Sequence, residues 1–430
     1  GNNQKRSNSY TVQDTQDQNL LGISRQSFQY LNVIGKGTNG KIWKVSHKND
    51  KGIFALKEFP KNIVMNSANA DSVNREFEML SQMNHPFIIN LHFAFQDISN
   101  LYLATDYYHG GDLRFHLGKI KKFNEKQIKF IGACVIQALE YIHSNNIMHR
   151  NIKPENLVFD ESGYVRLNNF GISSIIQEDN SKMTTGTLGY LAPEVLCHSN
   201  YNHTVDYFAL GVVLFECIIK KPLYSGKTRK EIKEKTVSTE VVLKNSSGKE
   251  KMSKECLNFI NKLIKRKPSD RLGSTNGVSD LKAHPWFAGF DWEMLYSKKL
   301  SSPFMFGTKD NFSKVDCKED TVHAHKQENK EKEEISHKGF TQFYYYFNKS
   351  DSADPHNTNI PKLNNPHLTS TKSTQMASSS KEELRVCNRS HYIEQNQKSK
   401  SETCAVTLTK IIEQKNKKEY EDVKLTSESL

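Results

Sequence analysis

A glycine-rich stretch near the start of the chain has the spacing that phosphate binding requires. Gly35, Gly37 and Gly40 fit G-x-G-x-x-G between two strand patterns, where missing side chains let backbone amides approach phosphate oxygens. A dinucleotide-binding loop of this form continues into a helix, but residues 41–45 have a strand pattern. Lys57 follows at the end of an apolar strand pattern, where its charge can meet phosphate. These residues predict a nucleotide phosphate site; the alternative for Lys57 is a solvated strand end.

Two later motifs narrow this prediction. His-Arg-Asn-Ile-Lys-Pro-Glu-Asn occupies residues 149–156, and Asn-Phe-Gly occupies residues 169–171. Preceded by the glycine-rich loop and its lysine, these motifs stand in the order found in protein kinases, which residues 28–292 resemble. The resemblance pairs the lysine with Glu76, which lies in a helical pattern. Glu78 is the rival for that role.

The resemblance also implies an ATP pocket. Ile42, Ala55 and Val158 match the positions that pack on adenine, and Thr105 is assigned to the same pocket. Taken singly, each packing residue is better explained as part of a hydrophobic core. The prediction of a base-binding surface therefore depends on all of them coming together with the glycine-rich loop.

Further motifs are similar to the AGC group of Ser/Thr kinases, with a YANK-like catalytic lobe. His-Pro-Phe-Ile at 85–88 and Gly-Gly-Asp-Leu at 110–113 carry this likeness. Residues 291–304 are similar to the start of the AGC tail. Phe340 and Phe343 are similar to its hydrophobic motif, which implies that they dock on the small lobe. The alternative is an isolated aromatic cluster in a disordered tail.

Two departures from the kinase pattern fall on the chemistry itself. Asn151 replaces the catalytic aspartate, and Asn169 replaces the metal-binding aspartate, while Lys153 and Asn156 are retained. An amide cannot hold the substrate proton near neutral pH, and loss of a general base typically lowers the rate roughly 10²–10⁴-fold. Because Mg²⁺ prefers charged oxygen ligands, Asn156 and Asn169 are expected to form a weak metal site if they form one.

The activation segment, residues 181–187, departs from the kinase pattern as well. Met183 aligns with the activating threonine of the family, and of the pocket that binds its phosphate only Arg150 is clearly retained. If the alignment with the family is shifted, Thr184 or Thr185 takes the role of the activating threonine. Thr187 matches the position that contacts the catalytic loop.

The patterns predict an α+β fold in which a small β-rich lobe precedes a large helical lobe. Residues 30–34, 41–46 and 53–59 have strand patterns, and residues 126–144 have a helical period. The ends of the chain are polar and poor in apolar residues, which is typical of disorder. The predicted parts are a disordered arm (1–27), a bilobal protein kinase domain (28–287), an AGC-type C-terminal extension with the hydrophobic motif (288–347) and a disordered tail (348–430).

Composition excludes several other classes of protein. The 60 Lys and Arg against 48 Asp and Glu give a net charge of +12, but the basic residues are dispersed and have no nucleic-acid-binding motif around them. Nucleic-acid binding is therefore not expected. The seven cysteines include no C-x-x-C pair, which argues against a disulfide framework and a zinc site. With neither a membrane-spanning stretch nor a secretory signal, the chain is expected to be cytoplasmic.

The leading hypothesis is a catalytically impaired pseudokinase that acts as an allosteric regulator or scaffold in phosphorylation signalling. It implies weak ATP binding and doubtful Mg²⁺ binding. The first alternative is an active basophilic Ser/Thr kinase with an atypical metal site. Asp112, Glu155 and Glu216 match acidic positions that recognise substrate arginines in relatives, whereas Lys220 and Lys221 beside that groove count against it.

The second alternative is a lipid-anchored signalling adaptor. Gly1, followed by Lys5 and Arg6, resembles a myristoylation terminus, although Lys5 stands where the motif has Ser or Thr. One acyl chain gives only marginal membrane affinity, so peripheral membrane contact also needs the basic residues. The sequence identifies neither the protein partner or substrate nor the oligomeric state.

Overall fold

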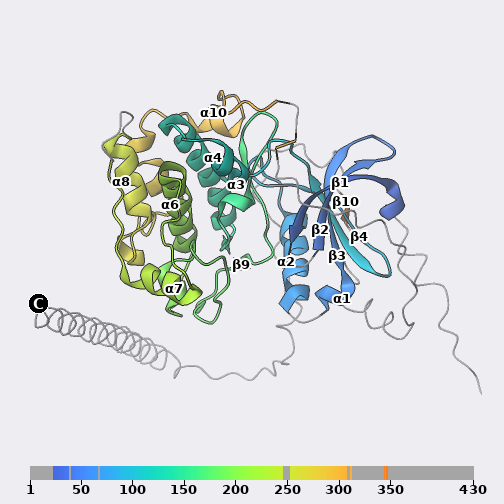
Figure 1. The fold of residues 1–430 in the computed structure, drawn as a ribbon, viewed down its shortest axis with the longest axis horizontal. Helices are drawn as coiled ribbons and strands as arrows, with labels where there is room; N and C mark the ends of the chain where they lie inside the picture. The colour runs from blue at the N-terminus through green and yellow to red at the C-terminus, as the bar shows by residue number, and fades with distance from the viewer. Residues whose placement is uncertain are drawn as a thin grey trace, which may run out of the picture. The chain divides into compact units, whose positions relative to one another are not determined.

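The structure is a computed structural model that describes residues 23–37, 40–65, 68–245, 252–307, 310–311, 343 and 345–346. Within these residues, the N-terminal lobe is a six-stranded antiparallel sheet in the order β1-β2-β3-β5-β4-β10 (Figure 1). Its elements are β1 (Phe28–Gly37), β2 (Gly40–His47), β3 (Ile53–Pro60), α1 (Lys61–Val64), α2 (Ala68–Gln82), β4 (Leu91–Gln96), β5 (Asn100–Asp106) and β10 (Tyr345–Tyr346). The β-rich character of this lobe is confirmed.

The sheet of the N-terminal lobe is covered on both faces. Alternate side chains of a strand point to opposite faces. Val45, Leu56 and Tyr102 are fully buried in an aromatic-rich core on one face. On the other face, Leu103 belongs to the main core together with Leu80 of α2. Burial on both sides explains why these strands are rich in β-branched and aromatic residues.

The C-terminal lobe is helical and contains two short two-stranded sheets (Figure 1). Its helices are α3 (Leu113–Lys119), α4 (Glu125–Ser144), α5 (Pro193–Leu196), α6 (Thr204–Ile219), α7 (Arg229–Ser238), α8 (Lys254–Leu263), α9 (Val278–Lys282) and α10 (Trp292–Tyr296). Its strands are β6 (Ile147–Met148), β7 (Leu157–Phe159), β8 (Val165–Leu167) and β9 (Ser174–Ile175). The predicted bilobal α+β fold is therefore confirmed.

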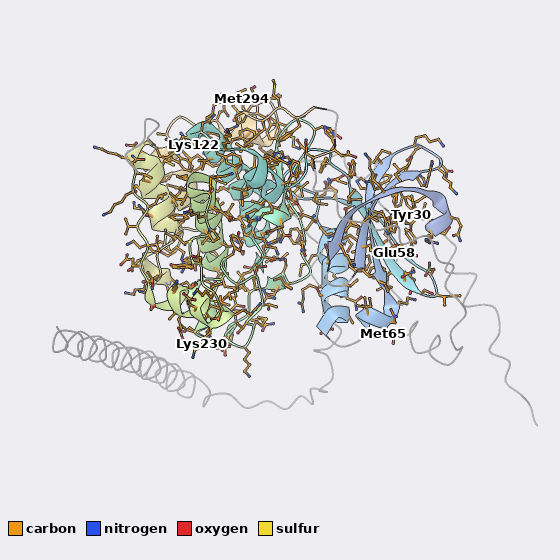
Figure 2. All side chains as sticks on the ribbon, viewed as in Figure 1. Tyr30, Glu58, Met65, Lys122, Lys230 and Met294 are labelled. Atoms are coloured by element: carbon orange, nitrogen blue, oxygen red, sulfur yellow. The ribbon has the colours of Figure 1, made fainter. Side chains whose placement is uncertain are left out.

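Two long helices form the centre of this lobe. α4 begins where the Asn124 side chain accepts a hydrogen bond from the backbone of Gln127, which is an N-cap. α6 is apolar along nearly its whole length and is buried between α4 and α8. Side chains fill the space between the helices, while Lys122 and Lys230 lie at the edge of the lobe (Figure 2). In the described part of the chain, no helix has the length and apolarity needed to cross a membrane.

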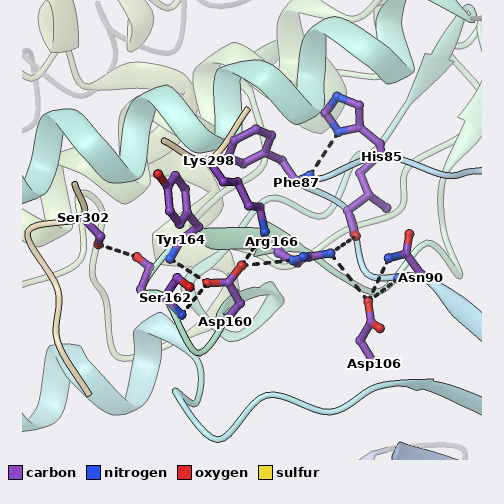
Figure 3. Close-up of polar contacts among 12 residues, drawn as sticks. His85, Phe87, Asn90, Asp106, Asp160, Ser162, Tyr164, Arg166, Lys298 and Ser302 are labelled. Carbon is purple, nitrogen blue, oxygen red and sulfur yellow. Dashed lines mark hydrogen bonds and ion pairs between the residues drawn. The ribbon is translucent and has the colours of Figure 1, made fainter. Parts of the chain in front are cut away.

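A chain of charges links the two lobes to the segment after α10. Arg166 of β8 lies between Asp106 at the end of β5 and Asp160 after β7 (Figure 3). Lys298 donates to the same Asp160 carboxylate at 2.5 Å. Because Asp160 is only 4% exposed, the two cations compensate a charge that would be costly to bury alone.

The structure bears on the predicted disordered arm over residues 1–27 only in part, and it does not test the predicted disordered tail over residues 348–430. Arg25–Ser27 form a short 3-10 helix (η2), so the disordered arm predicted over 1–27 is wrong for these residues. The backbone amide of Ser24 donates to the Ser27 hydroxyl at 3.1 Å, a local bond that composition does not reveal. The rest of the arm before residue 23 and the tail of 348–430 lie outside the described residues.

Candidate functional site

A buried ion pair joins β3 to α2. The Lys57 ammonium donates to the Glu76 carboxylate, and the two side chains are only 10% and 7% exposed. Glu78, the rival partner, is exposed on the same helix. Two residues along a helix turn the side chain to the opposite side, so only one of the two glutamates can face the sheet. The pair fixes the Lys57 ammonium beside the glycine-rich hairpin, where it can meet a phosphate.

Three of the four residues predicted to hold a nucleotide base lie on neighbouring strands around Lys57, and the fourth lies on the other lobe. Ala55 is opposite Thr105 in the β3–β5 register, and the Thr105 hydroxyl donates to the Ala55 carbonyl at 3.4 Å. Ile42 on β2 is opposite Lys57 itself. Val158 lies on β7 of the other lobe. Ile42, Ala55 and Val158 are half-buried, as a surface that packs on a planar base requires.

The glycine-rich segment forms the hairpin between β1 and β2. Gly35 pairs with Ile42 and Gly37 with Gly40, while residues 38 and 39 lie outside the described ranges. A Cβ on Gly40 would collide with the backbone of Glu58 on β3, so this close approach of two strands requires glycine.

Asp206 of α6 anchors the loop that carries the catalytic positions. Its carboxylate accepts hydrogen bonds from the backbone amides of His149 at 2.9 Å and Arg150 at 2.7 Å, and from the His143 ring at 2.9 Å. Burial acts to raise the pKa of Asp206, but the bond to His143 and the other donors hold that pKa below its usual value. The His149 ring packs edge-on against Phe170 at 4.8 Å.

Three amide side chains stand at the predicted base and metal positions. Asn169 Nδ2 donates to Asn156 Oδ1 at 3.2 Å, and Asn156 Nδ2 donates to the Asn151 carbonyl at 2.7 Å. The Thr187 hydroxyl donates to Asn151 Oδ1 at 3.4 Å. Asn169 has a φ of 70°, in the left-handed region that asparagine adopts more readily than most residues. The structure thus gathers these four residues into one hydrogen-bonded chain.

The donor set at these amides does not fit Mg²⁺, which prefers charged oxygen ligands. The side chains supply neutral oxygens, and Asn156 Oδ1 already accepts a hydrogen from Asn169. Within the described ranges, no group of three or more His, Cys, Asp or Glu side chains could hold a metal ion. Lys153, which precedes the 3-10 turn η3 (Pro154–Asn156), brings positive charge to the same loop. The site can contact a nucleotide but has little negative charge to hold a cation.

The activation segment is held by neutral contacts. The Arg150 guanidinium donates to the Ile172 carbonyl at 2.8 Å, to Met183 Sδ at 3.3 Å and to the Tyr201 hydroxyl at 3.2 Å. No ion pair with a carboxylate is recorded for Arg150 in the part of the chain that the structure describes. The exposed Thr184 hydroxyl is 2.9 Å from the His198 ring.

Thr185, the other predicted phosphate position, is also exposed. It lines a pocket with Arg150, Asn151, Thr187 and, on the far side of the segment, Tyr190. The activation segment, the catalytic loop and the helices α5 and α6 thus all contribute residues to the lining of one pocket.

Sequence reasoning missed two contributors to this region. Arg114, one residue beyond the Gly-Gly-Asp-Leu motif, binds the carboxylates of Glu155 and Glu216. Asp310 binds the Lys44 ammonium at 2.8 Å and the Tyr107 hydroxyl, which brings the C-terminal extension beside β2 and the end of β5. The signal for Arg114 is its position directly after the Gly-Gly-Asp-Leu motif. Asp310 carries no pattern that would have revealed it.

The hydrophobic motif is described in part. Phe343 is 2% exposed, and its ring lies 4.7 Å from the ring of Phe77 on α2. Tyr345–Tyr346 (β10) pair with Ala94 and Phe93 of β4. Phe343 thus docks on the small lobe beside the helix of Glu76, as the resemblance implied. Phe340 lies outside the described residues.

A sheet lobe with a buried lysine–glutamate pair, joined to a helical lobe with a carboxylate-anchored catalytic loop, defines the protein kinase fold. A family model of the protein kinase domain matches residues 28–287, and the chain belongs to this family.

Among the known proteins it resembles are three kinases. Serine/threonine-protein kinase sgk-1 of Caenorhabditis elegans is 36% identical over 65% of this chain and 60% of its own length. Protein kinase 2 of Dictyostelium discoideum is 34% identical over 66% of this chain and 59% of its own length. Serine/threonine-protein kinase SCH9 of Saccharomyces cerevisiae is 36% identical over 65% of this chain and 34% of its own length. The chain therefore matches less than two thirds of each relative. The predicted resemblance to AGC-type Ser/Thr kinases is confirmed.

Proposed function

We propose that this chain is a kinase-fold protein whose phosphoryl transfer is severely impaired, and that it works as an allosteric regulator or scaffold in phosphorylation signalling. The observation that carries the proposal is the hydrogen bond from Asn169 to Asn156. An amide at position 169 donates a hydrogen to the oxygen that an aspartate would leave available to a metal. With Asn151 also unable to accept a proton, both charges needed for the chemistry are missing.

The remaining parts favour a folded nucleotide site over a collapsed one. The Lys57–Glu76 pair is formed, and the side chains that pack behind it and around the catalytic loop, Leu80, Leu91, His149 and Phe170, are buried. Lys57, the glycine-rich hairpin and the half-buried base-binding residues would hold ATP weakly and without a tightly bound metal. Loss of the carboxylates with retention of the packing supports a role in which conformation, rather than turnover, carries the signal.

The proposal is tested by measuring phosphate transfer from Mg-ATP to two generic protein substrates, one basic and one without clusters of basic residues. The wild type is compared with the Asn151→Asp/Asn169→Asp double variant, and Lys57→Ala serves as a control for contaminating kinases. We expect the double variant to be at least roughly 10²-fold faster than the wild type. If the wild type and the double variant transfer phosphate at equal rates, and Lys57→Ala abolishes that transfer, the result would instead support the active basophilic kinase with an atypical metal site.

The cytoplasmic location is part of the same proposal. The lipid-anchored alternative depends on Gly1, Lys5 and Arg6, which lie outside the described residues, so membrane association stays a prediction. Mass spectrometry of the N-terminus of the protein isolated from its native cells tests it. An unmodified terminus would remove this alternative.

A further inference from the structure

The guanidinium of Arg114 lies between two glutamates at the edge of the catalytic loop. Its Nε donates to Glu155 Oε1 at 2.8 Å, and its Nη1 donates to Glu216 Oε1 at 2.6 Å. Its Nη2 donates to the Tyr190 hydroxyl at 2.5 Å and to Glu216 Oε2 at 3.4 Å. Tyr190 in turn donates to Glu216 at 2.6 Å. All three nitrogens of the guanidinium are engaged, which is the geometry by which proteins recognise an arginine side chain.

Four separate parts of the fold bring this set together. Arg114 is the second residue of α3, Glu155 lies in η3, Tyr190 follows the activation segment, and Glu216 lies near the end of α6. A cation in the first turn of a helix is electrostatically unfavourable. The two carboxylates, rather than the helix, therefore hold the Arg114 side chain in this position.

The burial of the Glu216 carboxylate makes a cation necessary beside it. The Glu216 side chain is 6% exposed, whereas those of Arg114 and Glu155 are 38% and 40% exposed. Burial acts to lower the pKa of Arg114, but its hydrogen bonds to Glu216 and Glu155 raise that pKa overall. The nearby Lys220 ammonium donates to the Leu117 carbonyl instead. Without Arg114, the buried Glu216 charge would strongly attract another cation.

This cluster adjoins the pocket beside the catalytic loop. Glu155 follows Asn151 by four residues, and Tyr190 lines the same pocket as Asn151 and Thr187. Tyr190 connects the two, because it lines this pocket and also donates to Glu216 of the cluster. The guanidinium of Arg114 occupies the position between Glu155 and Glu216 where an incoming arginine would bind.

We propose that Arg114 is an internal occupant of an arginine-binding site and thereby makes this groove reject polypeptides that carry arginine there. A polypeptide segment that docks in this groove has an uncharged side chain where it meets Glu155 and Glu216. This inference rests on the proposed function and deepens it, because it concerns which polypeptides the kinase fold selects.

The test is a binding measurement that does not depend on phosphoryl transfer. A fluorescein-labelled peptide, Gly-Arg-Arg-Ala-Ala-Ile-Gly, is titrated by fluorescence anisotropy with the full chain at low ionic strength, without nucleotide. The matched peptide has citrulline, a neutral isostere, in place of both arginines. The proteins are wild type, Arg114→Ala, Arg114→Gln, Arg114→Ala/Glu216→Gln and the exposed control Arg229→Ala, each checked for a cooperative melting transition.

We expect the wild type and Arg229→Ala to bind both peptides with the same affinity. Arg114→Ala and Arg114→Gln should prefer the arginine peptide by roughly tenfold or more, because a charged hydrogen-bonded pair is formed anew. The added Glu216→Gln change should abolish that preference. A wild type that already prefers the arginine peptide as strongly as Arg114→Ala overturns the proposal, and so do Arg114 variants that show no preference. Either result leaves the proposed catalytic impairment untouched, since no turnover is measured.

Discussion

The guanidinium of Arg150 donates a hydrogen bond to the sulfur of Met183, 3.3 Å away. Arg150 is 8% exposed, and its other side-chain partners are the Ile172 carbonyl and the Tyr201 hydroxyl. A thioether is a weak acceptor, and among the described residues the hydrogen-bond partners of this buried cation are all neutral. The hydrogen bonds of Arg150 thus join the catalytic loop to Met183 of the activation segment and to Tyr201. A kinase that is switched by phosphorylation at this position would need an anion where Met183 stands.

The first prediction concerns that contact. Met183→Glu should be more stable than the matched neutral variant Met183→Gln by about 1 kcal/mol, because only the glutamate offers Arg150 a charged acceptor. For a domain of this size, that difference corresponds to about 2–4 °C in the midpoint of thermal unfolding. Differential scanning calorimetry at neutral pH gives the comparison. Identical midpoints would show that Arg150 does not respond to charge at position 183.

The second prediction separates the two glutamates of α2. Glu76→Gln should weaken ATP binding roughly tenfold, since the buried Lys57 ammonium loses the carboxylate that orients it. The exposed Glu78→Gln, two residues further on the same helix, should leave ATP binding unchanged. The measurement is the shift in melting temperature as ATP is titrated, with and without Mg²⁺, because a ligand that binds only the folded state stabilises it. Equal losses from both variants would contradict the assignment of the pair.

The sequence could predict what depends on short-range pattern. Alternation placed the strands that carry Ala55 and Lys57, and the order of motifs placed Asn151 and Asn169 in one catalytic site. Glu76 was preferred over Glu78 only through the resemblance to kinases, because both lie in the same helical pattern. The direction in which the helix faces is set by packing against the sheet, and spacing alone does not give it.

Charge pairs that involve residues outside the recognised motifs were the part that could not be predicted. Arg114 meets Glu216 across 102 residues and Glu155 across 41, through elements that are adjacent only in the folded chain. Asp310 meets Lys44 across 266 residues. Charged residues are scattered over the whole sequence, so the correct partner is selected by tertiary structure and leaves no local signal.

The third prediction concerns acid stability. Burial, followed by the charges of Arg166, Lys298 and Lys282, lowers the pKa of His85 to about 3. Its ring accepts a hydrogen bond from the Phe87 amide at 3.2 Å (Figure 3) and stacks on Tyr141. An unfolded histidine titrates near pH 6.5, so below that pH the unfolded state binds the extra proton. Stability from this group is complete above pH 6.5 and is lost as the pH falls toward 3.

The change that tests this prediction is His85→Asn, whose side-chain oxygen can still accept from Phe87. Between pH 6 and 5, the unfolding free energy of the wild type should fall more steeply than that of the variant, by about 1 kcal/mol per pH unit. Urea unfolding at a series of pH values gives both slopes. Parallel curves for the two proteins would contradict a contribution of His85.

The last prediction concerns the ion pair between Arg271 and Glu194. Arg271 Nη1 and Nη2 contact the two carboxylate oxygens at 2.6 and 3.0 Å, and the side chains are 0% and 5% exposed. Arg271→Met should cost about 3–5 kcal/mol of unfolding free energy, because Glu194 keeps a buried charge without a partner. Replacing both residues with methionine should recover much of that loss, since no buried charge then remains. The exposed Lys267→Met provides the control, with an expected change within about 0.5 kcal/mol. Chemical unfolding of the wild type and these three variants gives the comparison, and a double variant less stable than Arg271→Met would show that the pair contributes more than charge compensation.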